Sequence, residues 1–283
     1  MMRKLGLSIA LALAGFGAQA ASLGLSSYHL TGTYALPAGT ASEASAVTWN
    51  ADSNHLFVLG DEGDALVEVT LQGTQVSAMT LTGFDDTEGL AYIGGGKFVV
   101  TEERLQDAYL LSYTAGGTVA RSSLPSASLG PTVGNVGIEG ISYDASNGSF
   151  VAVKEKTPQG VYAVSINFAA ASATVSNLFV PNLGTADLSD VQVLSNGNLL
   201  ILSQESARLM EVSRSGQVLG SIDLSSMADN IEGVTIDDKG TIYLVGENPE
   251  LYVLSAPVPE AQTWAMLVAG LGALAGVRRK RRG

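Results

Sequence analysis

The stretch EGLAYIGGGKFVVTE, residues 88–102, decides the fold. A short strand-forming segment at 88–92 is followed by three glycines at 94–96 and by an apolar run at 98–100. Glycine tolerates the positive φ angles that tight hairpin turns require. A run that is apolar on both faces indicates a strand that is buried on both sides. The stretch therefore predicts a β-hairpin whose second strand lies inside the protein.

Four further segments of the chain follow the same plan. We expect first strands at 45–49, 88–92, 139–143, 189–193 and 232–236, with starts separated by 43, 51, 50 and 43 residues. Each is followed by a turn and by an apolar run, at 56–59, 98–100, 150–153, 199–202 and 242–245. A third, alternating strand and a fourth, partly polar strand complete the unit, as at 66–71 with 76–81. A period in the forties with this content is typical of four-stranded propeller blades.

The ends of the repeat region suggest how the ring closes. The fifth unit stops after 251–254 without a fourth strand, whereas an unassigned strand at 28–36 precedes the first unit. We expect that N-terminal strand to form the outer edge of the last blade, because this hides strand edges. The prediction is an all-β, five-bladed β-propeller over residues 26–257. An open β-sandwich is the alternative, but it gives no period of about 45 residues.

Composition agrees with a large folded domain and limits its partners. The chain has 283 residues, is 46% apolar and 15% charged, and contains no cysteine, which argues against disorder and against a disulfide scaffold. Seven of its 15 Lys and Arg residues lie in the two terminal segments; without them, eight basic residues face 27 acidic ones. Nucleic acid is therefore disfavoured as a partner, because phosphate contacts need a basic patch. Cations are the expected small partners.

The two ends have the patterns of targeting segments. Residues 1–20 match a secretory signal peptide, with a basic start, an apolar run at 5–16 and a small-residue cleavage site at 18–20. A buried N-terminal helix is the alternative. We therefore expect export, without any need for disulfide chemistry, to a bacterial cell envelope or the extracellular space.

Residues 258–283 combine Val258-Pro259-Glu260, an apolar stretch at 264–277 and a basic cluster at 278–282. This arrangement resembles the PEP-CTERM sorting tail, although Ala261 stands where the second proline is usual. The resemblance implies transient anchoring in the inner membrane by a short hydrophobic helix, until an exosortase cleaves near Glu260. A plain, uncleaved tail anchor is the alternative.

Acidic residues recur at two positions of the repeat. In three units a Glu-Gly pair opens the first strand, at Glu88, Glu139 and Glu232. In all five units a carboxylate is found just past the buried strand, at Asp61, Glu102, Glu155, Glu205 and Glu247. One hairpin separates the two positions, so both sets should gather at one mouth of the central channel. Such carboxylates repel one another unless a cation or retained protons offset their charge.

A calcium ion fits this predicted cluster best, because calcium accepts six to eight oxygen ligands in irregular geometry. Zinc and copper are disfavoured, since the chain has no cysteine and only two histidines, His29 and His55. For any single glutamate the alternative is structural: it caps backbone amides or bridges adjacent blades.

Several phrases of the sequence resemble the SdiA-regulated (YjiK-like) domain family. They are GFDDTEGLAY at 83–92, FVVTEER at 98–104, GIEGISYD at 137–144, DLSD at 187–190 and NIEGV at 230–234. The resemblance implies a five-bladed propeller with a central calcium site and no established reaction, similar in plan to calcium-dependent lactonase, esterase and phytase-like propellers. By position, Glu88, Glu139 and Glu232 are its leading ligand candidates. The first and fourth units depart from the pattern, so ligation by Asp187 or Asp190 stays open.

Two classes of function fit these patterns. The first is a non-enzymatic, calcium-stabilised envelope protein that binds a small molecule or an extracellular polymer. It is favoured because no Gly-x-Ser-x-Gly elbow occurs and any Ser-His-Asp arrangement would depend on His29 or His55. The alternative is a calcium-dependent hydrolase of esters, lactones or phosphate esters, with Glu102 or Glu103 beside Arg104 as participants. In a third possibility the metal is structural and function lies on loops such as the irregular insertion at 124–136.

Overall fold

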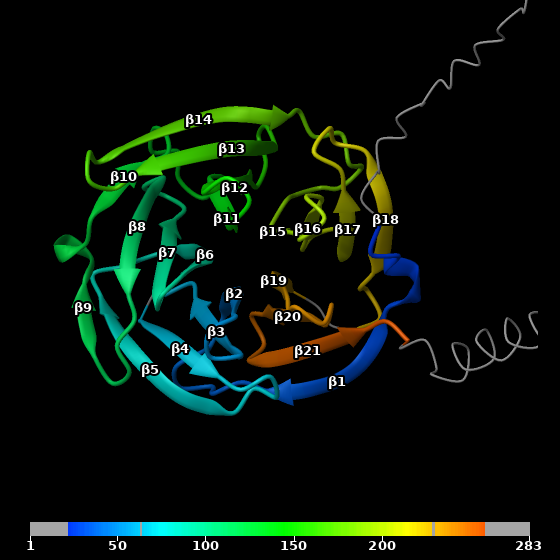
Figure 1. Cartoon of the computed structure of the whole chain (residues 1–283), viewed down its shortest axis with the longest axis horizontal. Helices are drawn as coiled ribbons and strands as arrows, with labels where there is room; N and C mark the ends of the chain where they lie inside the picture. Colours follow the sequence, from blue (N-terminus) through cyan, green and yellow to red (C-terminus); the bar gives the residue numbers. More distant parts are fainter. Residues whose placement is uncertain (1–21, 63, 228–229, 258–283) are drawn as a thin grey trace, which may run out of the picture.

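The computed structural model describes residues 22–62, 64–227 and 230–257, and these form a closed ring of five β-sheets (Figure 1). No α-helix occurs in this part of the chain, and so no helix there is long and apolar enough to cross a membrane. The expected signal peptide and hydrophobic tail lie outside the described residues. The all-β, five-bladed propeller predicted from the repeat is confirmed.

Each blade contains four antiparallel strands that run outward from the channel. Blade 1 consists of β2 (Ala44–Asn50), β3 (His55–Gly60), β4 (Ala65–Val69) and β5 (Gln75–Thr82). Blade 2 consists of β6 (Thr87–Gly94), β7 (Lys97–Glu102), β8 (Asp107–Ser112) and β10 (Ser126–Ser128). Blade 3 consists of β11 (Ile138–Asp144), β12 (Ser149–Lys154), β13 (Gly160–Asn167) and β14 (Ser172–Phe179). Blade 4 consists of β15 (Asp190–Val193), β16 (Leu199–Ser203), β17 (Arg208–Val212) and β18 (Val218–Asp223). Blade 5 consists of β19 (Ile231–Ile236), β20 (Ile242–Gly246), β21 (Glu250–Ser255) and β1 (His29–Ala35).

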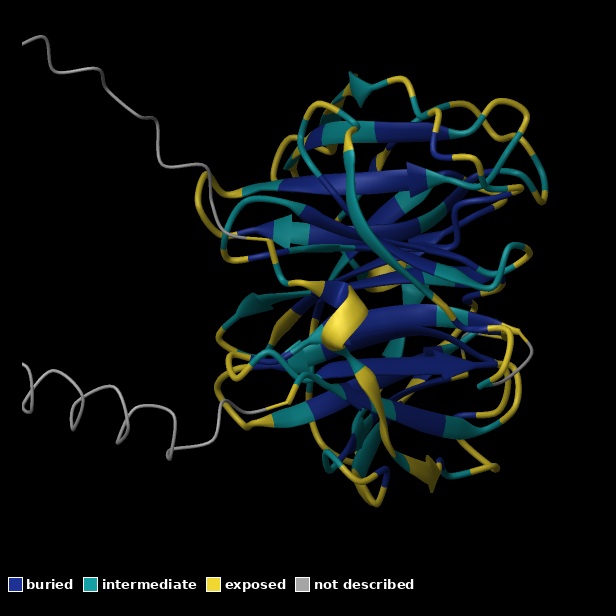
Figure 2. Cartoon of the chain, turned by 90° about the vertical axis from the view of Figure 1, so that its right-hand side faces the viewer, coloured by how far each residue is buried: buried dark blue, intermediate teal, exposed yellow. Residues whose placement is uncertain are grey.

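Burial follows the position of a strand within its blade. The second strands β16 and β20 are buried at every residue, as their two-sided apolar sequences predict. The outer strands β1 and β14 are mostly exposed or half-buried. Figure 2 shows that the strands are largely buried or intermediate and that exposed residues lie mainly on the turns. Apolar side chains lie where two blades can cover them, because burial of apolar surface is the dominant stabilising term.

The hydrophobic core is divided among the interfaces between blades. Five clusters of buried side chains are found in the described residues, and each joins two neighbouring blades. Phe57 of blade 1, for example, stacks on Phe98 of blade 2 with ring centroids 4.6 Å apart. Leu244 of blade 5 and Leu202 of blade 4 share another cluster. The ring is therefore held together by packing between successive blades around the whole circle.

The two ends of the propeller meet in blade 5. Strand β1 pairs antiparallel with β21, from His29 opposite Ser255 to Ala35 opposite Glu250. The backbone N–H of Leu36 continues this pairing by donating to the carbonyl of Pro249 at 2.7 Å. The predicted closure by the N-terminal strand is confirmed, and it covers the edge that β21 would otherwise expose.

The insertion between β8 and β11 is more ordered than the sequence suggests. Residues 126–128 form β10, the outer strand of blade 2, so the expectation of an irregular loop over 124–136 was wrong for this part. The earlier strand β9 (Thr118–Ala120) pairs in parallel with β5 of blade 1. The chain thus adds a fifth strand to blade 1 before it returns to complete blade 2. Three-residue strands give little sequence periodicity, which explains why neither was anticipated.

Candidate metal centre

One mouth of the channel opens into an acidic cavity of about 330 Å³. Its lining comes from all five blades, at two kinds of position: the start of an inner strand and the end of the strand beside it. Nine of the lining side chains are carboxylates: Glu43, Asp61, Asp86, Glu88, Glu103, Glu139, Glu155, Glu232 and Glu247. The remaining lining residues are Ser45, Arg104, Asn135 and Gln204. All three glutamates of the first predicted set and three of the five carboxylates of the second therefore meet at one mouth.

A β-bulge aims the inner-strand residues into this cavity. Pairing of the inner strand with its neighbour skips one residue in four blades. The skipped residues all line the cavity and are Ser45, Glu88, Glu139 and Glu232. A bulge turns a side chain away from its normal alternation, and bulges are enriched beside functional sites. In blade 4, β15 pairs without a break from Asp190 onward, and none of its described residues lines the cavity.

The glycine after each bulged glutamate has a separate role. A Cβ added to Gly140 would lie 2.5 Å from Oδ1 of Asp190 and 2.6 Å from its Cα, on the neighbouring blade. A Cβ on Gly233 would lie 3.0 Å from the carbonyl oxygen of Ser45, across the ring closure. The Glu-Gly pair thus combines a side chain directed into the cavity with a residue small enough for close contact between inner strands.

The cavity carboxylates form two groups compact enough to share a cation. In the first group, ligand oxygens of Asp61, Asp86 and Glu88 all lie within 4.8 Å of one another. In the second, the same holds for Glu103, Glu139 and Glu155. Glu88 and Glu139 are successive bulge residues, so the two groups lie on blades 1 to 3 and adjoin each other. Glu232 and Glu247 of blade 5 complete the acidic lining.

Burial and mutual repulsion raise the pKa values of these groups. Burial is the main cause at Glu139, whose pKa is raised to about 12, and the charge of Glu88 adds to it. Burial, followed by the charge of Glu232, raises the pKa of Glu88 well above its usual range. The pKa of Glu232 is raised to about 8 by burial and then by Glu247, and that of Asp86 to about 6 by burial and then by Glu103. Without a cation, the cavity therefore retains protons at neutral pH.

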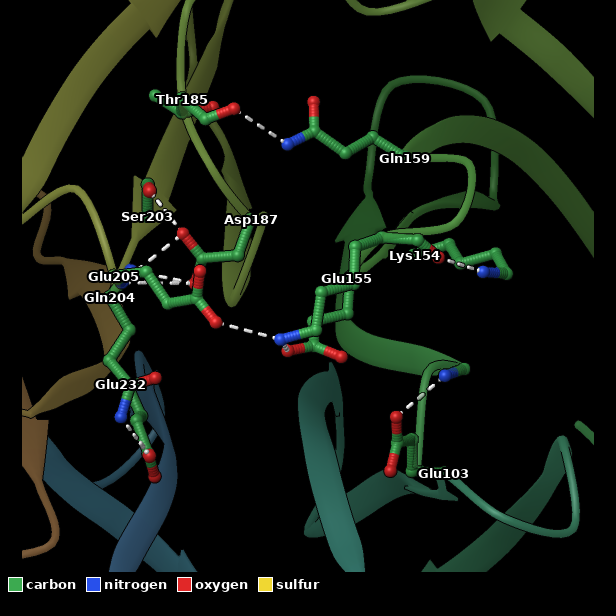
Figure 3. A network of polar contacts seen from close by, with 12 residues as sticks. Glu103, Lys154, Glu155, Gln159, Thr185, Asp187, Ser203, Gln204, Glu205 and Glu232 are labelled. Carbon is green, nitrogen blue, oxygen red and sulfur yellow. Dashed lines mark hydrogen bonds and ion pairs between the residues drawn. The ribbon is translucent and has the colours of Figure 1, made fainter. Parts of the chain in front are cut away.

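Few positive charges offset this acidity from within the chain. Arg104 Nη2 lies 2.9 Å from Oδ1 of Asp86, and Lys156 Nζ lies 2.5 Å from Oε1 of Glu155. Lys156 is shared, because it also lies 2.7 Å from Oε1 of Glu205. Glu103 Oε1 accepts a hydrogen bond from the backbone N–H of Gly137 at 2.6 Å (Figure 3). The other oxygen of Glu155, Oε2, is buried and has no hydrogen-bond partner.

Six of the eight carboxylates predicted from the repeat line the cavity: Asp61, Glu88, Glu139, Glu155, Glu232 and Glu247. The other two, Glu102 and Glu205, have different partners, as does Asp187, whose ligation the family resemblance left open. Glu102 is fully buried and binds Arg121 Nη1 at 2.8 and 2.9 Å. Asp187 accepts hydrogen bonds from Ser203 Oγ and from the backbone N–H groups of residues 204 and 205 (Figure 3). Glu205 is 45% exposed and pairs with Lys156.

A single rule explains the discrepancy at the second acidic position. The cavity residue of each blade is the first one after its second strand: Asp61, Glu103, Glu155, Gln204 and Glu247. Taking the first carboxylate past each apolar run of the sequence selects Glu102 instead of Glu103 and Glu205 instead of Gln204. A shift of one residue at the end of a strand directs the side chain to the opposite face.

Two further lining residues, Glu43 and Asp86, lie two positions before the bulge and were not predicted. Both have positive φ, 49° and 61°, which places them in the tight turn that enters the inner strand. The shared spacing to Ser45 and Glu88 is visible in the sequence and could have identified them. Asn135 reaches the cavity from the insertion before β11, where the sequence gives no such signal.

The donor set fits a hard cation. Apart from Arg104, the lining side chains all offer oxygen, from nine carboxylates, a hydroxyl and two amides. Calcium and magnesium prefer such oxygens, whereas zinc and copper prefer imidazole and thiolate. His29 lies on the outer strand β1, and His55 pairs with Glu68 at 2.8 Å, so neither histidine lines the cavity.

Comparison with known proteins identifies the family. The SdiA-regulated family model matches residues 20–255. The chain belongs to the SdiA-regulated family. Among solved structures, this SdiA-regulated propeller is similar to the glutaminyl cyclase of Myxococcus xanthus, with 16% identity and a TM-score of 0.53 over 81% of this chain and 95% of that one. It is also similar to a gluconolactonase from Xanthomonas campestris, with 12% identity and a TM-score of 0.50 over 77% and 87% of the two chains. At these identities the likeness concerns the fold alone.

Proposed function

We propose that this protein is an exported, calcium-binding β-propeller of the cell envelope or extracellular space that binds a small molecule or an extracellular polymer at its acidic channel mouth. The observation that carries the proposal is the pair of carboxylate triads within one cavity. Each triad offers three carboxylate oxygens, and a calcium ion, which accepts six to eight oxygen ligands, would complete its coordination with further oxygens such as backbone carbonyls and water. The buried, unpartnered Oε2 of Glu155 gives a bound cation a ligand that no protein group already uses.

Calorimetric titration of the purified protein with calcium tests this proposal. The wild type should bind calcium, and the combined variant Glu88→Gln, Glu139→Gln, Glu232→Gln should lose at least about tenfold in affinity, because amides replace three charged oxygens. Asp238→Asn is the matched control, since Asp238 is exposed on the turn between β19 and β20, at the opposite end of those strands. Equal calcium affinity in the triple variant and the control would refute the site.

Export and sorting form the second part of the proposal. They rest on the signal-peptide pattern at 1–20 and the sorting-tail pattern at 258–283. We expect the mature protein to begin near Ala21 and to end near Glu260 after cleavage by an exosortase. Intact-mass measurement of the protein recovered from its native host tests both ends. An undiminished mass of the full chain would contradict export and sorting while leaving the calcium proposal untouched.

A metal-dependent hydrolase of esters, lactones or phosphate esters is a second candidate. It is favoured by the surplus of carboxylates over what one calcium ion requires, which leaves a group such as Glu232 able to accept a proton. Assays of the purified protein against panels of these substrates, with and without chelator, separate the candidates. Turnover that disappears with chelator supports the hydrolase, whereas its absence on every panel supports binding without catalysis.

A further inference from the structure

Four side chains of the described cavity lining carry hydrogen-bond donors; Ser45 and Gln204 already donate to the backbone carbonyl of Glu43 and to Glu232, which leaves Arg104 and Asn135 on the side of blades 2 and 3. Arg104, whose side chain is 49% exposed, follows β7, and Asn135 is exposed in the insertion before β11. Arg104 Nη2 donates to Oδ1 of Asn135 at 3.2 Å. The carboxylate of Asp86 binds Arg104 twice, through Nη2 of the side chain and through the backbone N–H of Arg104 at 3.1 Å. Within the described residues, Nε of Arg104 and Nδ2 of Asn135 donate to no other protein group. Two fixed donors therefore remain available at the opening.

The chemistry of the whole lining limits what can enter. Nine carboxylates supply acceptors and negative charge, and in the part of the chain that the structure describes Arg104 is the single cationic side chain of the cavity lining. One divalent cation together with Arg104 supplies three positive charges, and the carboxylates remain in excess even when Glu88, Glu139 and Glu232 keep their protons, so a multiply charged anion such as a phosphate monoester is repelled. No apolar side chain of residues 22–62, 64–227 or 230–257 lines the cavity, which disfavours a hydrophobic ligand. A suitable ligand is neutral, carries oxygen acceptors for the two rim donors and the cation, and carries donors for the carboxylates.

Hydroxyl groups meet all of these requirements, because each both donates and accepts. We propose that the cavity binds a neutral polyhydroxylated molecule, of the class of a sugar or sugar lactone, with Arg104 and Asn135 as its rim contacts. The proposal rests on the proposed calcium function, since the ion supplies the positive charge at the floor. A volume of about 330 Å³ lies at the lower end of the range for small-molecule sites, which suits one sugar-sized unit.

Titrations with glucitol and gluconate, at saturating calcium, test this inference. The two probes share a six-carbon chain of hydroxyls, but gluconate carries a carboxylate in place of one terminal CH₂OH group. We expect glucitol to bind the calcium-loaded protein and gluconate to bind at least about tenfold more weakly. Arg104→Gln and Asn135→Ala should each weaken glucitol binding by about tenfold, the loss expected for one or two hydrogen bonds to a ligand. Asp238→Asn should leave it unchanged.

Direct calcium titration of the same samples shows whether a negative result concerns the ligand class or the calcium site itself. Calcium binding without glucitol binding, or tighter binding of gluconate, would overturn the ligand class while the calcium site stands. Glucitol affinity that is unchanged in both rim variants would overturn the assignment of Arg104 and Asn135. Failure to bind calcium would overturn the proposed function itself.

Discussion

Gln204 donates a hydrogen bond from Nε2 to Oε1 of Glu232 at 2.8 Å, which joins blades 4 and 5 at the rim of the acidic cavity (Figure 3). Gln204 occupies the position where the other four blades carry Asp61, Glu103, Glu155 and Glu247. Blade 4 therefore interrupts the ring of charge with an amide that supports a neighbouring carboxylate. The acidic mouth is consequently asymmetric, with its two compact carboxylate triads on the opposite side, in blades 1 to 3.

Replacement of this amide by a carboxylate should make the fold depend more strongly on calcium. In Gln204→Glu, two carboxylates would face each other at hydrogen-bond distance, and like charges so close repel unless one is protonated. We expect the free energy of unfolding in calcium-free buffer at neutral pH to fall by about 1–2 kcal/mol. Saturating calcium should restore most of the loss. Urea denaturation in both buffers measures this, and an equal loss with and without calcium would contradict it.

The raised pKa values give a definite sign for the dependence of stability on pH. A carboxyl with a raised pKa binds more protons in the folded than in the unfolded state, so its contribution to stability is lost as pH rises through the folded value. The calcium-free protein should therefore become less stable from about pH 4 upward. Asp86 contributes to this loss up to about 6, Glu232 up to about 8 and Glu139 to still higher pH.

Bound calcium should flatten or reverse this trend, because the cation replaces the protons that offset the carboxylate charges. Denaturant midpoints measured from about pH 5 to about pH 9, with and without calcium, test the sign. Stability of the calcium-free protein that rises across this range would show that the cavity carboxylates do not control it.

Lys156 should compete with a cation for the second triad. Its ammonium group pairs with Glu155 Oε1, and Glu155 shares a triad with Glu103 and Glu139. Lys156→Gln removes that positive charge, so calcium affinity should increase by about two- to fivefold, the range for a partly exposed ion pair. Lys239→Gln, on the exposed turn between β19 and β20, is the control and should have no effect. Weaker calcium binding in Lys156→Gln would mean that Lys156 instead positions Glu155.

The contact between blades at Gly140 predicts a loss of stability that has no direct link to the metal. In Gly140→Ala the new methyl group would lie 2.5 Å from Asp190 Oδ1 and 2.6 Å from its Cα, so the inner strands of blades 3 and 4 must separate. We expect the free energy of unfolding to fall by about 1–3 kcal/mol, as in other overpacked cores. Gly39→Ala is the matched control, because nothing lies within 4 Å of the added Cβ. Equal thermal midpoints for the two variants would exclude the proposed close contact.

Much of the fold follows from features that repeat along the chain. Each of the five hairpins has a second strand that is apolar on both faces, so five interfaces between blades are needed to bury these strands. The unassigned strand at 28–36 can pair with the one strand edge that the last blade leaves exposed. The short strands β9 and β10 could not be predicted, because three residues do not establish a period and because β9 pairs with a different blade. The pairing of β9 with blade 1 depends on tertiary contacts rather than on local sequence.

The sequence predicts that carboxylates form the candidate site, but it does not predict every residue that lines the cavity. Glu88, Glu139 and Glu232 share the Glu-Gly signature, and the bulge that aims them inward is a consistent feature of the inner strands. The second acidic position required knowledge of where each buried strand ends. Residues 102 and 103 are both glutamates, so the sequence does not show which of the two faces the cavity. The structure does, because β7 ends at Glu102 and Glu103 is the first residue after it.

This pair of adjacent glutamates allows structural and metal-binding roles to be separated by matched variants. Glu102 is fully buried, and its carboxylate accepts two hydrogen bonds from Arg121 and one from the backbone N–H of Asp85 at 2.9 Å. Glu103 Oε1 accepts a hydrogen bond from the backbone N–H of Gly137 at 2.6 Å, an interaction that an amide oxygen can also accept. Glu102→Gln should lower the free energy of unfolding by about 3 kcal/mol, because the amide leaves Arg121 incompletely neutralised.

Calcium affinity should respond in the opposite order. Glu102→Gln should leave it unchanged, since Glu102 does not line the cavity, whereas Glu103→Gln should reduce it by about tenfold with little loss of stability. Thermal unfolding and calorimetric calcium titration of both variants provide the two readouts. A loss of calcium affinity in Glu102→Gln that matches the loss in Glu103→Gln would show that the two positions are not distinct. The division of adjacent glutamates between a buried ion pair and a metal cavity would then be wrong.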